Sequence, residues 1–222
     1  MRPAPRRLRA VLLDWDGTIV DSAEASFRCY VRLFDSYRIP FDRERFQRTY
    51  SPDWYRTYEA LGLPRECWAE ADARWLGFYA GEENVILGGA REALKRLDEA
   101  GIRLGLVTSG TRSRVARELE GLKMGGLFRV VVSAEDVERR KPDPEPLRRG
   151  LEFLGMPAAE AAYVGDSPED VEMARAAGVF VVGVPGPFPN RDALQAARPD
   201  MTCESLVAAV AALLAQPGTS QG

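Results

Sequence analysis

The sequence predicts an α/β protein: a doubly wound parallel sheet with a small helical segment inserted near its N-terminal end. From residue 89 onward, short apolar runs alternate with helix-like segments, a spacing typical of a parallel sheet covered by helices on both faces. Between residues 22 and 83 this alternation stops, and 14 of the chain's 20 aromatic residues lie there. A chain of 222 residues is long enough for one large domain that carries such an insert.

The first strand is predicted over residues 10–13, because an uninterrupted apolar run is typical of a strand in the middle of a parallel sheet. The run ends in two acids, Asp14 and Asp16. Residues two apart in a strand project to the same side, so both carboxylates are expected to face one small volume past the strand's carboxyl end. Two anions that close repel each other unless a cation or a shared proton relieves them. Asp and Gly are also common in turns, so this stretch alone leaves an ordinary turn open.

The segment 22–83 is predicted to be a small helical cap. Asp21 or Ser22 can cap a first helix that begins near Ala23 and carries an apolar stripe of Phe27, Tyr30, Val31 and Phe34. Turn-forming residues near positions 39, 51 and 62 divide the whole segment into three or four short helices, the first one included. The segment holds nine arginines and no lysine. These arginines could capture an anion, although a solvated surface is the usual place for any single one of them.

The remaining core, residues 1–21 and 84–222, is predicted to alternate helices with four further strands. The helices are expected at 89–100, 112–119, 145–154, 169–177 and 205–214, and the strands at 102–107, 128–132, 161–164 and 179–184. Gly178 is expected to end the helix before it, as glycine often does at this position. The last residues, 216–222, are predicted to be disordered.

Composition excludes several kinds of site and partner. The chain has no histidine, so neither a Ser-His-Asp triad nor an imidazole metal ligand is available. A net charge of −3 gives no sign of a nucleic-acid-binding face, and no apolar run approaches the roughly 18 residues of a membrane span. Three widely spaced cysteines without a CxxC pair indicate reduced thiols and a cytoplasmic location. A monomer or a homodimer is expected.

Chemistry-bearing side chains follow the ends of several predicted strands. Carboxyl ends of parallel strands share one edge of the sheet, so these residues can meet although they are far apart in the sequence. Carboxylates together with a hydroxyl and an ammonium suit a Mg²⁺ ion that faces a phosphate. The residues concerned are Asp14, Asp16, Thr108, Ser109, Lys141, Asp166 and Asp170. Lys141 is one of only three lysines in the chain.

In these features the chain resembles the haloacid dehalogenase superfamily, in its phosphatase and phosphomutase branch. The family's four motifs match, in the right order, Asp14-Trp15-Asp16-Gly17-Thr18, Thr108 with Ser109-Gly110, Lys141 in Lys-Pro-Asp-Pro, and Gly165-Asp166-Ser167-Pro168-Glu169-Asp170. The resemblance extends over nearly the whole chain and implies a Rossmann-like core with a cap domain. Any one motif would be weak evidence, whereas four in order at strand ends are strong.

The resemblance also implies a role for each matched residue. Asp14 would be the nucleophile that forms an aspartyl-phosphate, and Asp16 would be the general acid and base. Mg²⁺ would be held by the Asp14 carboxylate, the backbone carbonyl of Asp16, and Asp166, with Asp170 acting through water. The phosphoryl oxygens would be bound by Thr108, Ser109 and Lys141. Trp15 is expected to point the other way, into the packing of the core.

The first motif favours a phosphatase that acts on a small phosphorylated metabolite. Dehalogenases of the family lack the second aspartate, and the run Gly17 to Ser22 looks most like that of phosphoglycolate phosphatases. Selectivity is expected from the cap, and Arg28, Arg32, Arg48 and Arg56 are candidate substrate contacts by their location. A sugar phosphomutase of the β-phosphoglucomutase type shares every catalytic residue and stays an alternative. So do, from other classes, a phosphorylated-aspartate signalling domain and a binding module without catalysis.

Overall fold

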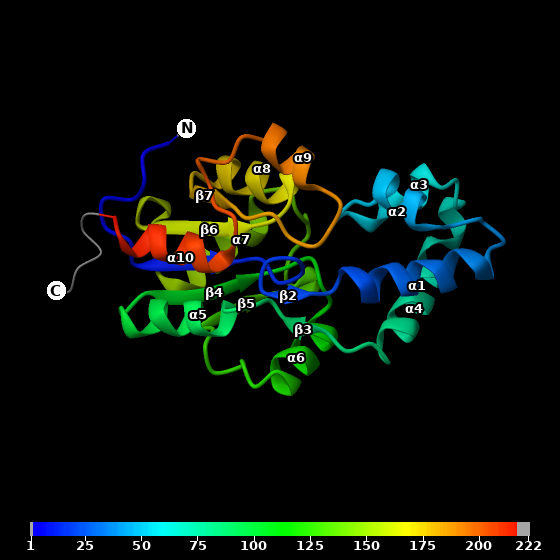
Figure 1. Ribbon diagram of the computed structural model, residues 1–222, viewed down its shortest axis with the longest axis horizontal. Helices are drawn as coiled ribbons and strands as arrows, with labels where there is room; N and C mark the ends of the chain where they lie inside the picture. The colour runs from blue at the N-terminus through cyan, green and yellow to red at the C-terminus, as the bar shows by residue number, and fades with distance from the viewer. Residues whose placement is uncertain (1, 217–222) are drawn as a thin grey trace.

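The computed structural model describes residues 2–216, and its centre is a six-stranded sheet in the order β5-β4-β1-β6-β7-β8 (Figure 1). All of its neighbouring strands pair in parallel. The strands are β1 (Ala10–Leu13), β4 (Arg103–Val107), β5 (Val130–Val132), β6 (Ala161–Gly165), β7 (Phe180–Gly183) and β8 (Met201–Thr202). Because β1 lies in the middle and is buried along its whole length, its apolar run needs no polar alternation.

Helices cover both faces of this sheet, as expected for a doubly wound fold. One face carries α5 (Ala90–Glu99), α6 (Arg112–Gly121) and α10 (Leu206–Leu214), and the other carries α7 (Glu145–Leu154), α8 (Pro168–Ala177) and α9 (Arg191–Ala196). Successive side chains of β1 enter different cores: Val11 and Leu13 pack under the first group, and Leu12 under the second. The predicted fold class is confirmed.

The helical segment branches from the core through a short two-stranded ribbon. In this ribbon β2 (Val20–Asp21) pairs antiparallel with β3 (Val85–Ile86). Between them lie α1 (Ala23–Ser36), α2 (Arg43–Thr49), α3 (Trp54–Ala60), a 3-10 turn at Arg65–Cys67, and α4 (Trp68–Tyr79). Figure 1 shows these four helices to one side of the sheet. Their own core is largely aromatic. The domain boundaries at residues 22 and 83 stay a prediction.

Most predicted elements are present with ends shifted by one or two residues, and the exceptions are short. The strand expected at 128–132 begins at Val130, because Phe128 packs edge-on against Trp15 in the core. Strands β2, β3 and β8 and helix α9 were not predicted, since two to six residues show no readable period. The described residues also form 3-10 turns at Ala134–Asp136 and Ala158–Glu160. The predicted disordered tail lies outside the described residues, except for Gln216.

Two local expectations about side chains have different outcomes. Ser22 does occupy the N-cap position of α1, but its hydroxyl makes no capping bond and instead donates to Asp16. Trp15 is fully buried in the core, as expected. Within residues 2–216, no helix is long and apolar enough to cross a membrane.

Candidate active site

The loop after β1 turns sharply and brings the Asp14 carboxylate to the carboxyl edge of the sheet. Gly17 makes this turn possible with a φ of 80°, a left-handed conformation that glycine adopts easily. Its N–H donates to the carbonyl of Val20 over 2.8 Å. A Cβ at Gly17 would lie 2.2 Å from Oδ2 of Asp166. Glycine is therefore needed at this position for the close approach of the acid as well as for the turn.

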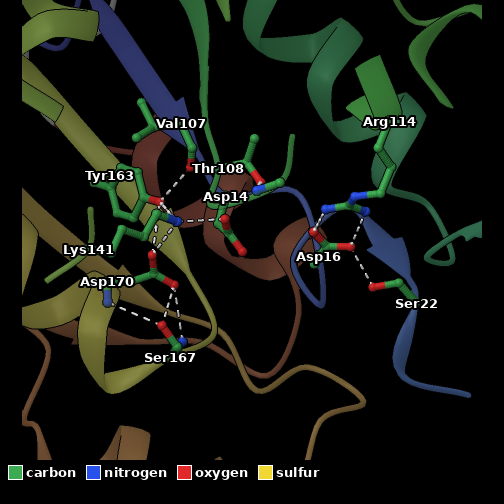
Figure 2. Close-up of polar contacts among 11 residues, drawn as sticks. Asp14, Asp16, Ser22, Val107, Thr108, Arg114, Lys141, Tyr163, Ser167 and Asp170 are labelled. Atoms are coloured by element: carbon green, nitrogen blue, oxygen red, sulfur yellow. Dashed lines mark hydrogen bonds and ion pairs between the residues drawn. The ribbon is translucent and has the colours of Figure 1, made fainter. Parts of the chain in front are cut away.

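Lys141 connects the loop after β1 with β6 and α8 at the centre of the site (Figure 2). Its Nζ donates to Oδ1 of Asp14 over 2.6 Å, to Oδ1 of Asp170 over 2.8 Å, and to the hydroxyl of Tyr163 over 2.8 Å. Burial by itself would lower the pKa of Lys141, but the two carboxylates raise it above its ordinary value. The ammonium is therefore charged and offsets two buried acids.

Asp170 is fixed from both sides, which aims one oxygen at Lys141. It is the third residue of α8, and its Oδ2 accepts from the backbone N–H and the hydroxyl of Ser167 in a capping box. Its other oxygen, Oδ1, lies 3.0 Å from the Tyr163 hydroxyl, which is also 3.1 Å from the carbonyl of Val107. Asp170 thus both stabilises its own helix and positions the lysine.

Three acids of the site form a group that fits a hard cation. One oxygen each of Asp14, Asp166 and Asp170 can be chosen so that all lie within 4.8 Å of one another. Burial raises the pKa of Asp14 to about 7, although the charge of Lys141 opposes this shift. The pKa of Asp166 is raised well above its usual range, by burial and by the negative charge of Asp14. Oδ2 of Asp166 is buried without a hydrogen-bond donor among residues 2–216. Such an oxygen suits a metal ligand, and Mg²⁺ prefers carboxylate oxygens.

Asp16 points away from Asp14, toward Arg114 of α6 (Figure 2). The guanidinium makes two parallel bonds to it, Nη1 to Oδ1 over 3.0 Å and Nη2 to Oδ2 over 2.5 Å, and Ser22 donates to Oδ1 over 2.7 Å. Burial would raise the pKa of Asp16, but Arg114 and Ser22 lower it below its ordinary value. The candidate acid–base is therefore held in its ionised form in this conformation.

Arg114 itself belongs to a buried network that reaches the return strand of the helical segment. It contacts Glu118 one helical turn later over 3.2 Å. Glu118 also accepts from the indole N–H of Trp15 over 2.5 Å and from the side-chain amide of Asn84 over 3.1 Å. Asn84 directly precedes β3. The position of Asp16 is thus tied to the ribbon that joins the helical segment to the core.

A cavity of about 190 Å³ lies between the sheet edge and helices α1, α3 and α4. Its lining includes Asp14, Asp16, Thr108, Ser109, Lys141 and Asp166. The hydroxyl oxygen of Thr108 accepts from the backbone N–H of Gly110 over 3.0 Å, which fixes the loop after β4. The structure therefore brings together six of the seven residues predicted for chemistry, and Asp170 lies directly behind Lys141.

The four candidate arginines of the helical segment are not among the residues that line this cavity. Their nearest partners are other residues: Arg28 pairs with Glu82, Arg32 lies over the ring of Phe78, and Arg48 pairs with Glu44. Arg56 pairs with Asp53 and lies 4.0 Å from the buried Glu169. Arg112, the other arginine near the second motif, pairs with Asp136 at the surface.

Three residues of the site were missed by the sequence analysis. Tyr163 lies within β6 and looks like an ordinary strand residue, and Arg114 looks like one of many surface arginines. The four-residue spacing of Arg114 and Glu118 indicates that the two side chains pair on one helix. It does not predict the contact of Arg114 with Asp16. Tyr50 approaches from the helical segment, and burial together with the acid of Asp166 raises its pKa well above the ordinary value, so its hydroxyl keeps its proton.

This fold and this set of side chains define a hydrolase of the haloacid dehalogenase type. The model of the haloacid dehalogenase-like hydrolase family matches residues 11–184. The chain belongs to this family.

Individual relatives are named phosphatases. The chain is 32% identical over 206 residues to the pyrophosphatase PpaX of Bacillus velezensis, a match that covers 90% of this chain and 94% of that protein. It is 30% identical over 227 residues to the phosphoglycolate phosphatase of Salmonella typhimurium, covering 90% of each. A haloacid dehalogenase-like hydrolase of Streptococcus pneumoniae superposes with a TM-score of 0.81 at 19% identity, covering 92% and 98%. The predictions of family and enzyme class, a phosphatase, are confirmed.

Proposed function

We propose that the chain hydrolyses a small phosphomonoester with Mg²⁺, in two steps through a phosphorylated Asp14. The observation that carries this proposal is the contact of the Asp14 carboxylate with Lys141 in the lining of the cavity. A nucleophilic carboxylate needs a cationic neighbour, because a phosphate would otherwise meet a cluster of acids.

In the first step an Asp14 oxygen attacks phosphorus, and the bond from phosphorus to the alcohol oxygen breaks. Asp16 supplies the proton that the departing alcohol takes up. In the second step Asp16, now ionised, removes a proton from water, which displaces the phosphate from Asp14. The pair with Arg114 favours the ionised form of Asp16 and so suits the second step. Proton donation in the first step requires this pair to loosen.

The phosphoryl oxygens are bound by donors of the chain itself. Lys141 supplies an ammonium, and Thr108 and Ser109 supply hydroxyl groups at the cavity wall. Asp14, Asp166 and the backbone carbonyl of Asp16 would hold Mg²⁺, with Asp170 behind them. A bound Mg²⁺ supplies positive charge that offsets the repulsion between carboxylates and phosphate.

The test is phosphate release from a panel of phosphate esters with and without Mg²⁺. The panel includes p-nitrophenyl phosphate, a sugar phosphate, phosphoglycolate and, because of the names of the relatives, pyrophosphate. Asp14→Asn is expected to lose activity by a factor of about 10³ or more, and the matched control Asp98→Asn, at an exposed site, to keep it.

Full activity of Asp14→Asn would overturn the covalent route. An isomeric sugar phosphate as the main product, with little free phosphate, would establish the phosphomutase alternative. Stable phosphorylation of Asp14 without turnover would instead indicate a signalling domain.

We also propose that the enzyme works in a reducing compartment such as the cytoplasm. Cys29, Cys67 and Cys203 are all free thiols in the structure. A small phosphorylated metabolite, rather than a macromolecule, fits the volume of the cavity.

A further inference from the structure

Aromatic rings form a large part of the cavity lining. We call this part the aromatic wall, and it consists of Tyr30, Tyr50, Trp54, Tyr58, Trp75 and Phe188. Tyr30 and Trp75 lie side by side, with ring centroids 5.9 Å apart, and Tyr50 stacks on Phe188 at 4.5 Å. Five of the six rings come from the helical segment, so this segment presents mainly π surfaces to the departing part of a substrate.

None of the nine arginines of the segment lines the cavity. Most of them have partners elsewhere, as shown by Arg74, which pairs with Glu70 and lies over the ring of Tyr37. A substrate with a second anionic group, such as a carboxylate or another phosphate, needs a cation to receive it. The segment offers none at the aromatic wall.

The one charged side chain that the segment contributes to the cavity lining is an acid, Asp72 of α4. Its Oδ2 accepts from the hydroxyl of Tyr55 over 2.8 Å. Its Oδ1 is buried and accepts no hydrogen bond from the described part of the chain. Burial raises the pKa of Asp72, and the polar groups of Tyr55, Tyr58 and Trp54 oppose this effect. A cation close to the wall would stabilise the charged carboxylate.

The basic residues that do border the cavity are already engaged or exposed. Lys141 and Arg114 are paired with the catalytic acids. Arg140 is exposed and lies over the ring of Trp54, 4.6 Å from its centroid. Both residues also line a second, more open depression. Solvent screens an exposed charge, whereas Asp72 is partly buried against the wall. The existing contact also shows that the Trp54 face accepts a cation.

We propose that the departing alcohol carries an ammonium group, so that the substrate class is phosphorylated amino alcohols. This rests on the proposed phosphatase function. Ring faces are negative and attract an ammonium within about 6 Å, and several rings around one cation are a known way to bind quaternary amines. Asp72 adds an acidic side chain beside the same rings, next to Tyr58 and Trp54. A carboxylate or phosphate beside Asp72 would be repelled by its charge.

The experiment compares two esters of equal shape and different charge. Choline phosphate carries a trimethylammonium group, and 3,3-dimethylbutyl phosphate has a carbon in place of its nitrogen. With the unmodified enzyme and Mg²⁺, kcat/KM is expected to be about tenfold or more higher for the charged ester. Phosphoethanolamine, phosphoglycolate and pyrophosphate complete the series, and phosphoethanolamine is expected to exceed both of the anionic compounds.

Asp72→Asn keeps the shape of the side chain and removes its charge. It is expected to lower kcat/KM for choline phosphate about tenfold more than kcat/KM for the dimethylbutyl ester. The matched control is Glu70→Gln, one exposed acid two residues earlier on the same helix, which should change neither.

Equal rates for the two isosteric esters would overturn the proposal, and so would a preference for phosphoglycolate or pyrophosphate. Both results come from the unmodified enzyme and do not depend on whether Asp72→Asn folds. If no compound is hydrolysed, p-nitrophenyl phosphate included, the proposed function itself fails. Hydrolysis of p-nitrophenyl phosphate without preference for an ammonium ester overturns this inference alone.

Discussion

Two contacts decide what each acid of the first motif can do. Asp14 faces Lys141, and Asp16 faces Arg114 (Figure 2). The alternation of side chains and the motif pattern predicted Asp14, Asp16 and Lys141 as site residues. Neither could predict Arg114, because its contact with Asp16 joins residues 98 positions apart. A long-range partner of this kind leaves no local pattern, so the division of labour between the two acids becomes visible only in the fold.

Arg114→Lys is expected to slow esters of alkyl alcohols more than p-nitrophenyl phosphate. Lysine keeps the charge but loses the two parallel bonds that orient Asp16. A nitrophenolate leaves without needing a proton, whereas an alkoxide depends on general-acid catalysis. We expect kcat/KM for the alkyl ester to fall roughly tenfold more than that for p-nitrophenyl phosphate.

The control for this prediction is Arg112→Lys, two residues earlier on the same helix. Arg112 is exposed and pairs with Asp136 at the surface. Its replacement should leave both rates unchanged. Equal losses for the two esters in Arg114→Lys would mean that the arginine supports the fold and not the position of Asp16.

Gly17→Ala is expected to remove the response of the enzyme to Mg²⁺. A Cβ there would lie 2.2 Å from Oδ2 of Asp166, too close unless the acid moves. Gly62→Ala is the matched control, because Gly62 has a similar positive φ but an added Cβ would meet no atom within 4 Å. Both variants should lose about 1 kcal/mol of stability from backbone strain. Only Gly17→Ala should lose the rise in melting temperature that Mg²⁺ produces in the unmodified enzyme.

At the scale of elements, the start of α8 couples helix stability to the site. Ser167 caps this helix, and the reciprocal partner in the capping box is Asp170, which also holds Lys141. The sequence predicted the helix and its end at Gly178, because capping residues and apolar periodicity are local signals. It did not predict β8 or the β2–β3 ribbon, whose two-residue strands exist only through their partners.

Ser167→Ala and Ser205→Ala should separate these two roles. Each serine accepts from the backbone N–H of the third residue of its helix over 3.2 Å, but Ser205 caps α10, away from the catalytic acids. Both changes are expected to lower the free energy of unfolding by about 1 kcal/mol in urea titrations. Only Ser167→Ala should also slow phosphate release, by about tenfold or more, because Asp170 loses a partner that orients it. Equal activity in both variants would show that the capping box serves the helix alone.

At the scale of the whole molecule, the buried acids link folding, pH and Mg²⁺. An unperturbed aspartate has a pKa of 3.8, and burial raises that of Asp14 to about 7. The pKa of Asp166 is raised as well. The folded chain therefore binds protons more tightly than the unfolded chain. In the absence of metal, the raised pKa values therefore contribute their full amount to the free energy of unfolding below about pH 4. This contribution is lost as the pH rises toward 7.

Mg²⁺ should consequently stabilise the protein more at pH 8 than at pH 5, because a metal ligand must be deprotonated. The measurement is the melting temperature at both pH values with and without Mg²⁺. Asp14→Asn should flatten the pH dependence of the metal-free protein, since its side chain does not titrate. A gain from Mg²⁺ that is the same at both pH values would contradict the assignment of these acids as its ligands.

The ribbon of β2 and β3 makes the helical segment between these strands replaceable by a segment of another length. Val20 lies opposite Ile86, so the chain leaves the core and returns to it at adjacent positions. Neighbouring strands are about 5 Å apart, and a segment of almost any length can be spliced between two such points without stretching the sheet. Under the proposed function, residues 22–83 can therefore be replaced by another segment that binds a different alcohol, while the residues proposed for phosphoryl transfer stay in place.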